Sequence, residues 1–136
     1  MTRTQKTALG VAGITSLGIG AFILAAPHAF YASYGVALGA DPSLLSELRA
    51  PGAGLAAFGA VMLSGIVRPA LRQAAIVSAL TVFLAFPAGR VLGLVADGMP
   101  SDGILAALFA ELAIAALCLF AFRRGSRPVA SGIAAP

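Results

Sequence analysis

The sequence contains very little charge for its length. Only 10% of its 136 residues are Asp, Glu, Lys or Arg, whereas soluble domains carry about 25%. Apolar residues make up 60% of the chain, and the mean hydropathy is +0.97. A chain of this composition cannot cover a water-exposed surface with polar groups. The composition therefore excludes an ordinary soluble domain and predicts an integral membrane protein.

Residues that bind metals or form disulfides are equally scarce. The single cysteine, Cys118, excludes an internal disulfide, and the single histidine, His28, has no second His or Cys at metal-ligand spacing. The sequence also lacks a Gly-rich phosphate loop, a serine elbow and a Cys-x-x-Cys motif. We therefore expect no metal and no cofactor. Cys118 is expected to pack as a small hydrophobe, and His28 to lie at the membrane interface.

Apolar runs make up most of the chain. They extend over residues 8–26, 48–67, 74–96 and 103–122, and each has the roughly 20 residues that a membrane-spanning helix needs. The first run exceeds the apolar core of a signal peptide, about 7–15 residues, so we expect it to be retained. The sequence predicts an all-α integral membrane bundle of four transmembrane helices. This single domain, residues 1–124, is followed by a flexible cytoplasmic tail over residues 125–136.

Prolines refine the second and third spans. Asp41 and Pro42 form a helix start signal, so the second helix can begin as early as Pro42. Pro51 and Pro87 lie inside the second and third runs, where each is expected to bend its helix.

The basic residues predict how the chain is oriented. The formal net charge is +4, but the cations lie in short clusters between apolar runs, which excludes nucleic acid as a partner. Seven cations fall on one side of a chain with four spans: Arg3, Lys6, Arg68, Arg72, Arg123, Arg124 and Arg127. The connections on the other side carry Asp41, Asp97 and Asp102. The positive-inside rule then places both termini in the cytoplasm, in a multi-pass protein of the bacterial inner membrane.

Small residues recur at four-residue spacing along three of the runs, where they allow helices to approach closely in a lipid bilayer. The stripes are Ala8, Ala12, Ser16 and Gly20; Gly52, Ala56, Ala60 and Ser64; and Ala85, Gly89 and Gly93. Packing within the bundle is the expected role, and a homodimer face is the alternative.

Four charged residues stand inside or at the rim of the apolar runs: Glu47, Arg49, Arg90 and Glu111. Charges at membrane depth are costly and usually mark a working site. Helical rise places Arg90 about 10 Å and Glu111 about 13 Å from the outer ends of adjacent spans, so we predict that they form an ion pair. Glu47 and Arg49 are two residues apart and lie on opposite helix faces.

These charges predict an outward-opening polar pocket. Arg49 lies on the side of the second small-residue stripe and is expected to point into the bundle, where it would line the pocket with Arg90 and Glu111. Glu47 would lie at the lip of the pocket. His28, Tyr31 and Tyr34 of the first loop would close over it.

The charged residues also carry a resemblance to a known family. The string Glu47-Leu48-Arg49-Ala50 is followed by Gly52 and Gly54, then by Gly89-Arg90, Asp97-Gly98-Met99-Pro100 and Glu111-Leu112. This order resembles the bacterial four-helix membrane proteins of domain-of-unknown-function family 4345, over nearly the whole chain. That resemblance implies fold and location but no activity. A looser similarity to DoxX-like membrane proteins implies architecture only.

Several functions are compatible with such a pocket. The first hypothesis is a non-enzymatic protein whose pocket binds a small lipophilic or anionic molecule, or a partner membrane subunit. The second is a small membrane enzyme that isomerises or cyclises a lipid or isoprenoid, with Glu111 or Glu47 as the general acid or base. A purely structural role, in which ion pairs fix helix register, is also open. Proton-coupled transport ranks last, because no ionisable residue lies in the inner half of any span.

Overall fold

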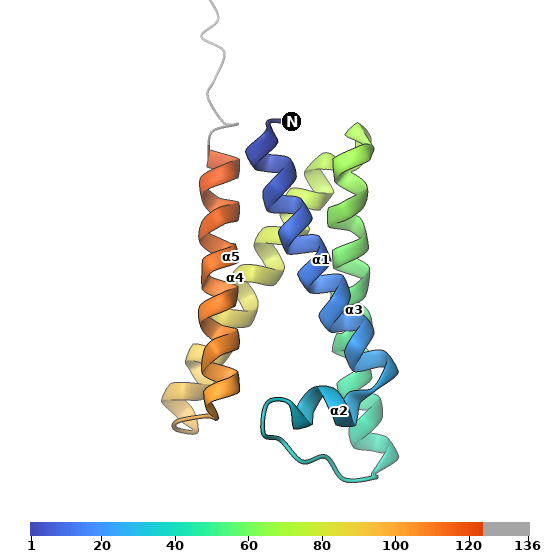
Figure 1. Ribbon diagram of the computed structural model, residues 1–136, viewed down its shortest axis with the longest axis vertical. Helices are drawn as coiled ribbons and strands as arrows, with labels where there is room; N and C mark the ends of the chain where they lie inside the picture. Colours follow the sequence, from blue (N-terminus) through green and yellow to red (C-terminus); the bar gives the residue numbers. More distant parts are fainter. Residues whose placement is uncertain (124–136) are drawn as a thin grey trace, which may run out of the picture.

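The chain folds into a bundle of helices, and the computed structural model describes residues 1–123 (Figure 1). Its elements are α1 (Arg3–Ala25), α2 (Pro27–Ala32), α3 (Pro42–Val67), the 3-10 turn η1 (Pro69–Leu71), α4 (Arg72–Ala96) and α5 (Asp102–Arg123). Helices α1, α3, α4 and α5 are long and apolar enough to cross a membrane. The prediction of an all-α bundle with four membrane-spanning helices is confirmed. The predicted tail over residues 125–136 lies outside the described residues.

The helices begin where the sequence provides caps. The Thr2 side chain accepts a hydrogen bond from the Gln5 backbone N–H, and the Gln5 side chain accepts one from the Thr2 N–H, so the two residues form a capping box at the start of α1. The Asp41 carboxylate accepts a hydrogen bond from the Ser43 N–H, and Pro42 occupies the first position of α3. The early start of the second span is thus confirmed. Both α3 and α4 continue through their internal prolines.

Glycines bring α1 and α3 into close contact, and this is the most extensive helix pair in the bundle. A Cβ added at Gly20 would collide with the α3 backbone at Gly52 and Ala56, and one added at Gly59 would collide with the α1 backbone at Leu17. The absence of side chains at these positions lets the two backbones approach each other.

The three small-residue stripes differ in how many of their residues are buried. Ala8, Ala12, Ser16 and Gly20 are all buried, so the packing role predicted for the first stripe is confirmed. In the second stripe Gly52 is buried, Ala56 and Ser64 are half-buried, and Ala60 is exposed. The fully buried face of α3 follows Gly52, Leu55, Gly59 and Met62. In the third stripe Ala85 and Gly89 are exposed. The packing prediction is therefore wrong for Ala60 of the second stripe and for these two residues of the third.

Helices α4 and α5 form the other side of the bundle. Helix α5 packs on α4 and on α1, while α4 also contacts α3. The short helix α2 and the segment that follows it lie across one end of the bundle (Figure 1). The opposite end holds the N-terminus, the α3–α4 junction and the end of α5, and therefore Arg3, Lys6, Arg68, Arg72 and Arg123. Asp41, Asp97 and Asp102 lie at the end that carries α2.

Candidate functional site

Arg90 of α4 and Glu111 of α5 form an ion pair with two parallel hydrogen bonds. The Arg90 Nε donates to Glu111 Oε2 and the Arg90 Nη2 donates to Glu111 Oε1, each at 2.9 Å. The side chains are 28% and 12% exposed. Within residues 1–123 this is the only salt bridge. The predicted pairing is confirmed, and its forked geometry is the strongest that an arginine and a carboxylate adopt.

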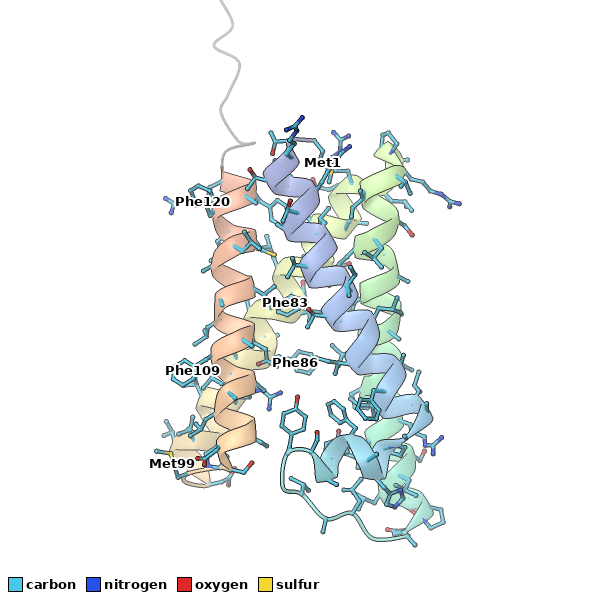
Figure 2. All side chains as sticks on the ribbon, in the orientation of Figure 1. Met1, Phe83, Phe86, Met99, Phe109 and Phe120 are labelled. Atoms are coloured by element: carbon cyan, nitrogen blue, oxygen red, sulfur yellow. The ribbon has the colours of Figure 1, made fainter. Side chains whose placement is uncertain are left out.

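The ion pair lies on the wall of a cavity of about 260 Å³. Residues of α1, α2, α3, α4 and α5 line the cavity, so it lies between the α1–α3 pair and the α4–α5 pair. Its lining is mostly apolar and consists of Ser16, Ile19, Ile23, Phe30, Tyr31, Tyr34, Leu55, Val82, Phe83, Phe86, Arg90, Ile104 and Glu111. Phe83 and Phe86 project from α4 toward α1 across this space (Figure 2). The cavity is therefore apolar except for this ion pair and the hydroxyl groups of Ser16, Tyr31 and Tyr34.

Buried Ser16, in the lining of the cavity, has a hydrogen-bond partner within the bundle. Its hydroxyl donates a 2.7 Å hydrogen bond to the Leu55 carbonyl of α3. Among the described residues, no buried side-chain nitrogen or oxygen lacks a partner. Because the ion pair uses only two of the N–H donors of the Arg90 guanidinium, further donors remain for a molecule in the cavity.

Helix α2 and the residues just after it line one end of the cavity with Phe30, Tyr31 and Tyr34, which we call the aromatic cap. Phe30 is buried, and its ring centre lies 5.5 Å from that of Phe22, 5.2 Å from Tyr31 and 5.1 Å from Tyr34. The contacts with Phe22 and Tyr31 are edge-on, and such contacts add to the free energy of burial. From the start of α5, the Ser101 hydroxyl donates a hydrogen bond to the Tyr34 carbonyl. The cap is thus attached to both sides of the bundle.

Tyr31 connects this cap to the ion pair electrostatically. Burial raises the pKa of the Tyr31 phenol above its ordinary value, and the positive charge of Arg90 acts in the opposite, lowering direction. The phenol therefore remains protonated at neutral pH. It offers a hydroxyl group at the edge of the cavity, beside the charged pair.

The structure brings together some of the residues expected at the site and separates others. Tyr31 and Tyr34 line the cavity with Arg90 and Glu111, as expected. His28 is exposed instead, with its Nε2 3.2 Å from the Gly39 carbonyl oxygen. Of the residues missed from the sequence, Phe83 and Phe86 precede Arg90 on α4, but phenylalanine is common in any membrane helix and gave no distinct signal.

Arg49 does not reach the cavity, so the expectation that it points into the bundle is wrong. Arg49 and Glu47 are both exposed, and neither lines the cavity. The packed face of α3 runs through Gly52 and Leu55 to half-buried Leu48. Each residue turns a helix by about 100°, so Arg49 projects well away from that face. A binding role for Glu47 and Arg49 stays a prediction.

Comparison with known proteins identifies the family of this chain. No curated protein matches it, and no solved structure does. The looser DoxX-like similarity therefore remains a prediction. The family described as "Domain of unknown function (DUF4345)" matches residues 4–122, which include all four membrane-spanning helices and both members of the ion pair. The chain belongs to this family.

Proposed function

We propose that this membrane protein binds a small, neutral, lipophilic molecule in the cavity between the α1–α3 and α4–α5 pairs. The observation that carries the proposal is the forked Arg90–Glu111 pair on the wall of an apolar cavity of about 260 Å³. The proposal includes location in the bacterial inner membrane with both termini in the cytoplasm. The clustering of cations at the end of the bundle opposite α2 supports this orientation.

The size and lining of the cavity favour a small apolar ligand. Ligand pockets usually enclose about 300–1,000 Å³, so a cavity of about 260 Å³ accommodates a small molecule or one end of a longer one. Ile19, Ile23 and Leu55 face the aromatic residues of α4 across it. This surface gains free energy when an apolar group replaces water.

The ion pair favours a neutral polar group over an anion. Arg90 and Glu111 cancel each other's charge, so the pair offers both donors and acceptors without a net field that would attract an anion. A hydroxyl or carbonyl group can bond to the remaining Arg90 donors, and a hydroxyl can also donate to Glu111. The Tyr31 hydroxyl adds a third polar contact at the same edge. An amphiphile with one such group matches this arrangement.

The same geometry supports binding better than acid–base catalysis. Both carboxylate oxygens of Glu111 accept hydrogen bonds from Arg90. Each oxygen keeps a second lone pair that can accept a hydrogen bond from a ligand. Protonation of Glu111 would, however, remove the charge that holds both bonds to Arg90, so a general base at this position would have to break the pair. For the same reason the pair is poorly arranged to act as a proton donor.

The two tyrosines provide a direct test of binding. The chain has no tryptophan and only two tyrosines, and both line the cavity, so the intrinsic fluorescence of the protein reports on this site alone. We expect a brominated alkyl alcohol to quench the tyrosine fluorescence of the detergent-solubilised protein at lower concentrations than the corresponding brominated carboxylic acid. The acid brings a negative charge that must be desolvated beside a neutral pair.

A matched pair of variants on α5 provides the control. Ile104→Phe adds bulk inside the cavity, whereas Leu112→Phe adds it on the exposed side of the same helix. We expect Ile104→Phe to abolish saturable quenching and Leu112→Phe to leave it unchanged. Equal quenching in both variants, or a preference for the acid, would overturn the proposal.

A further inference from the structure

A second groove lies at the end of the bundle opposite α2, on the far side of the membrane from the aromatic cap. It has a volume of about 530 Å³ and is formed by residues of α1, α4 and α5. We propose that this groove binds one anionic phospholipid, with the phosphate at its polar rim and one acyl chain along its apolar wall. This site shares no residue with the Arg90–Glu111 cavity.

The rim of the groove has the chemistry of a phosphodiester site. Arg72 at the start of α4 and Arg123 at the end of α5 supply two guanidinium groups, and Gln5 and Gln73 supply amide donors. Guanidinium groups bond phosphate oxygens through paired N–H donors. Because these cations come from different helices, a phosphate between them would be held from two sides.

No acidic side chain neutralises this rim. The sequence contains five acidic residues: Asp41, Glu47, Asp97, Asp102 and Glu111. Three of them lie at the α2 end of the bundle, Glu47 lies in the second turn of α3 near that same end, and Glu111 is bound to Arg90. The positive charge of Arg72 and Arg123 is therefore available to an anion from outside the described chain.

An apolar wall continues from the rim along the helices, and it favours a lipid over a free phosphate ion. Ile76 and Leu80 are four residues apart on α4, and Leu119 and Phe122 are three apart on α5, so each pair lies on one helix face. Ile76, Leu80 and Phe122 are half-buried. Together they form a furrow along the membrane normal in which an acyl chain can lie. Basic pockets between membrane helices bind anionic headgroups in this manner.

Variants that remove one positive charge test whether the rim of the groove binds the lipid phosphate. The full-length protein is released from vesicles of equal parts phosphatidylcholine and phosphatidylglycerol, and its bound lipids are identified by native mass spectrometry. We expect it to retain one phosphatidylglycerol in preference to phosphatidylcholine. Arg72→Gln should lower this retention about fivefold, and the further change Arg123→Gln should lower it by a similar factor again. Arg68→Gln removes a cation at the same end of the bundle but outside the groove, and should have little effect. An equal loss in Arg68→Gln would overturn the proposal, since it would reflect only the general surface charge.

Variants of the wall test the acyl chain. Ile76→Trp fills the furrow without changing charge, whereas Val77→Trp places the same bulk on the exposed side of α4. We expect Ile76→Trp to lose phosphatidylglycerol as Arg72→Gln does, and Val77→Trp to retain it. Glycerol 3-phosphate, which has a headgroup but no chain, should not displace the lipid. Displacement by glycerol 3-phosphate, or equal retention by both tryptophan variants, would contradict the proposal. Circular dichroism verifies that each variant is folded.

Discussion

Arg90 and Glu111 connect two adjacent membrane-spanning helices through a pair of parallel 2.9 Å hydrogen bonds. The bonds lie about one helical turn beyond the buried Pro87 of α4. Proline cannot donate a backbone hydrogen bond, so α4 loses an internal bond close to the place where it gains a strong bond to α5. The ion pair therefore connects α4 to α5 next to the segment where the α4 backbone lacks a hydrogen bond.

Breaking this ion pair should destabilise the fold more than removing it completely. Arg90→Met leaves the Glu111 carboxylate without its partner, and Glu111→Met leaves the Arg90 guanidinium without its own. We expect each single change to lower the free energy of unfolding by about 2–4 kcal/mol, because an unpaired charge remains in an apolar setting. The double variant Arg90→Met/Glu111→Met should recover to within about 1 kcal/mol of the original protein.

Unfolding in a fixed detergent, followed by circular dichroism, measures this cycle. Additive effects of the single changes would show that the two side chains act independently. The double variant should also need a higher concentration of the brominated alcohol for the same quenching, because the alcohol hydroxyl loses its partners on Arg90 and Glu111. This measurement separates the structural role of the pair from its role in binding.

The α1–α3 contact should tolerate no side chain at its closest points. A Cβ at Gly20 would collide with the backbone of α3, whereas a Cβ at Gly18 on the same helix has no neighbour within 4 Å. We expect Gly20→Ala to destabilise the protein by about 1–3 kcal/mol through forced separation of the helices. Gly18→Ala should be neutral or stabilise it by up to about 1 kcal/mol, because alanine favours helix. Thermal unfolding of Gly20→Ala and Gly18→Ala in the same detergent measures this difference in stability. Equal midpoint temperatures for the two variants would contradict the close contact.

The sequence predicted the Arg90–Glu111 pair because two simple constraints determine it. The connection between α4 and α5 is short, so the two helices are antiparallel neighbours. Constant helical rise then converts residue counts into depth. Neither step depends on how side chains pack. Membrane spans follow equally directly, since their length and hydropathy are local properties of the chain.

The face that each helix buries could not be predicted as well. In α3 the stripe at four-residue spacing predicted one face, and its members Gly52 and Ala56 do approach Gly20 of α1. The close contact then continues to Gly59 and not to Ala60, which is exposed. An Ala- and Gly-rich helix has small residues on several faces, and the packing of the neighbouring helix determines which face is buried. Helix α2 was expected to be part of a loop, because its six residues are too few to show a helical period.

Tyr31 should titrate at a higher pH than an ordinary tyrosine. Its pKa is raised from 10.0 by burial, while Arg90 partly lowers it. In a Tyr34→Phe background, where Tyr31 is the only tyrosine, we expect ultraviolet absorbance to show a midpoint above that value. Removing the cation with Arg90→Met should move the midpoint higher still. A raised pKa stabilises the fold below the unfolded-state value and loses this contribution as the pH rises through the folded-state value. A midpoint that falls in Arg90→Met would contradict the assigned electrostatics.

Phe30 should anchor the cap that closes the cavity. Its ring is 9% exposed and contacts three other aromatic rings, so Phe30→Ala should cost about 3–5 kcal/mol of local packing free energy. We expect faster proteolysis within residues 33–41 and weaker quenching by the brominated alcohol. Phe109→Ala removes a ring that is 69% exposed and serves as the control. If both variants resist proteolysis equally, the aromatic cluster does not hold the cap.

Thiol labelling in cells tests the proposed orientation. The native Cys118 is fully buried, so it gives little background with a membrane-impermeant maleimide. A cysteine at the exposed position Val36, beside α2, should be labelled in intact cells, because the positive-inside rule places that end outside the cytoplasm. A cysteine at exposed Arg68, at the α3–α4 junction, should be labelled only after the membrane is permeabilised. The charge that Arg68→Cys removes is one of several at that end, so it should not reverse the topology. The opposite labelling pattern would place the aromatic cap in the cytoplasm and overturn the orientation.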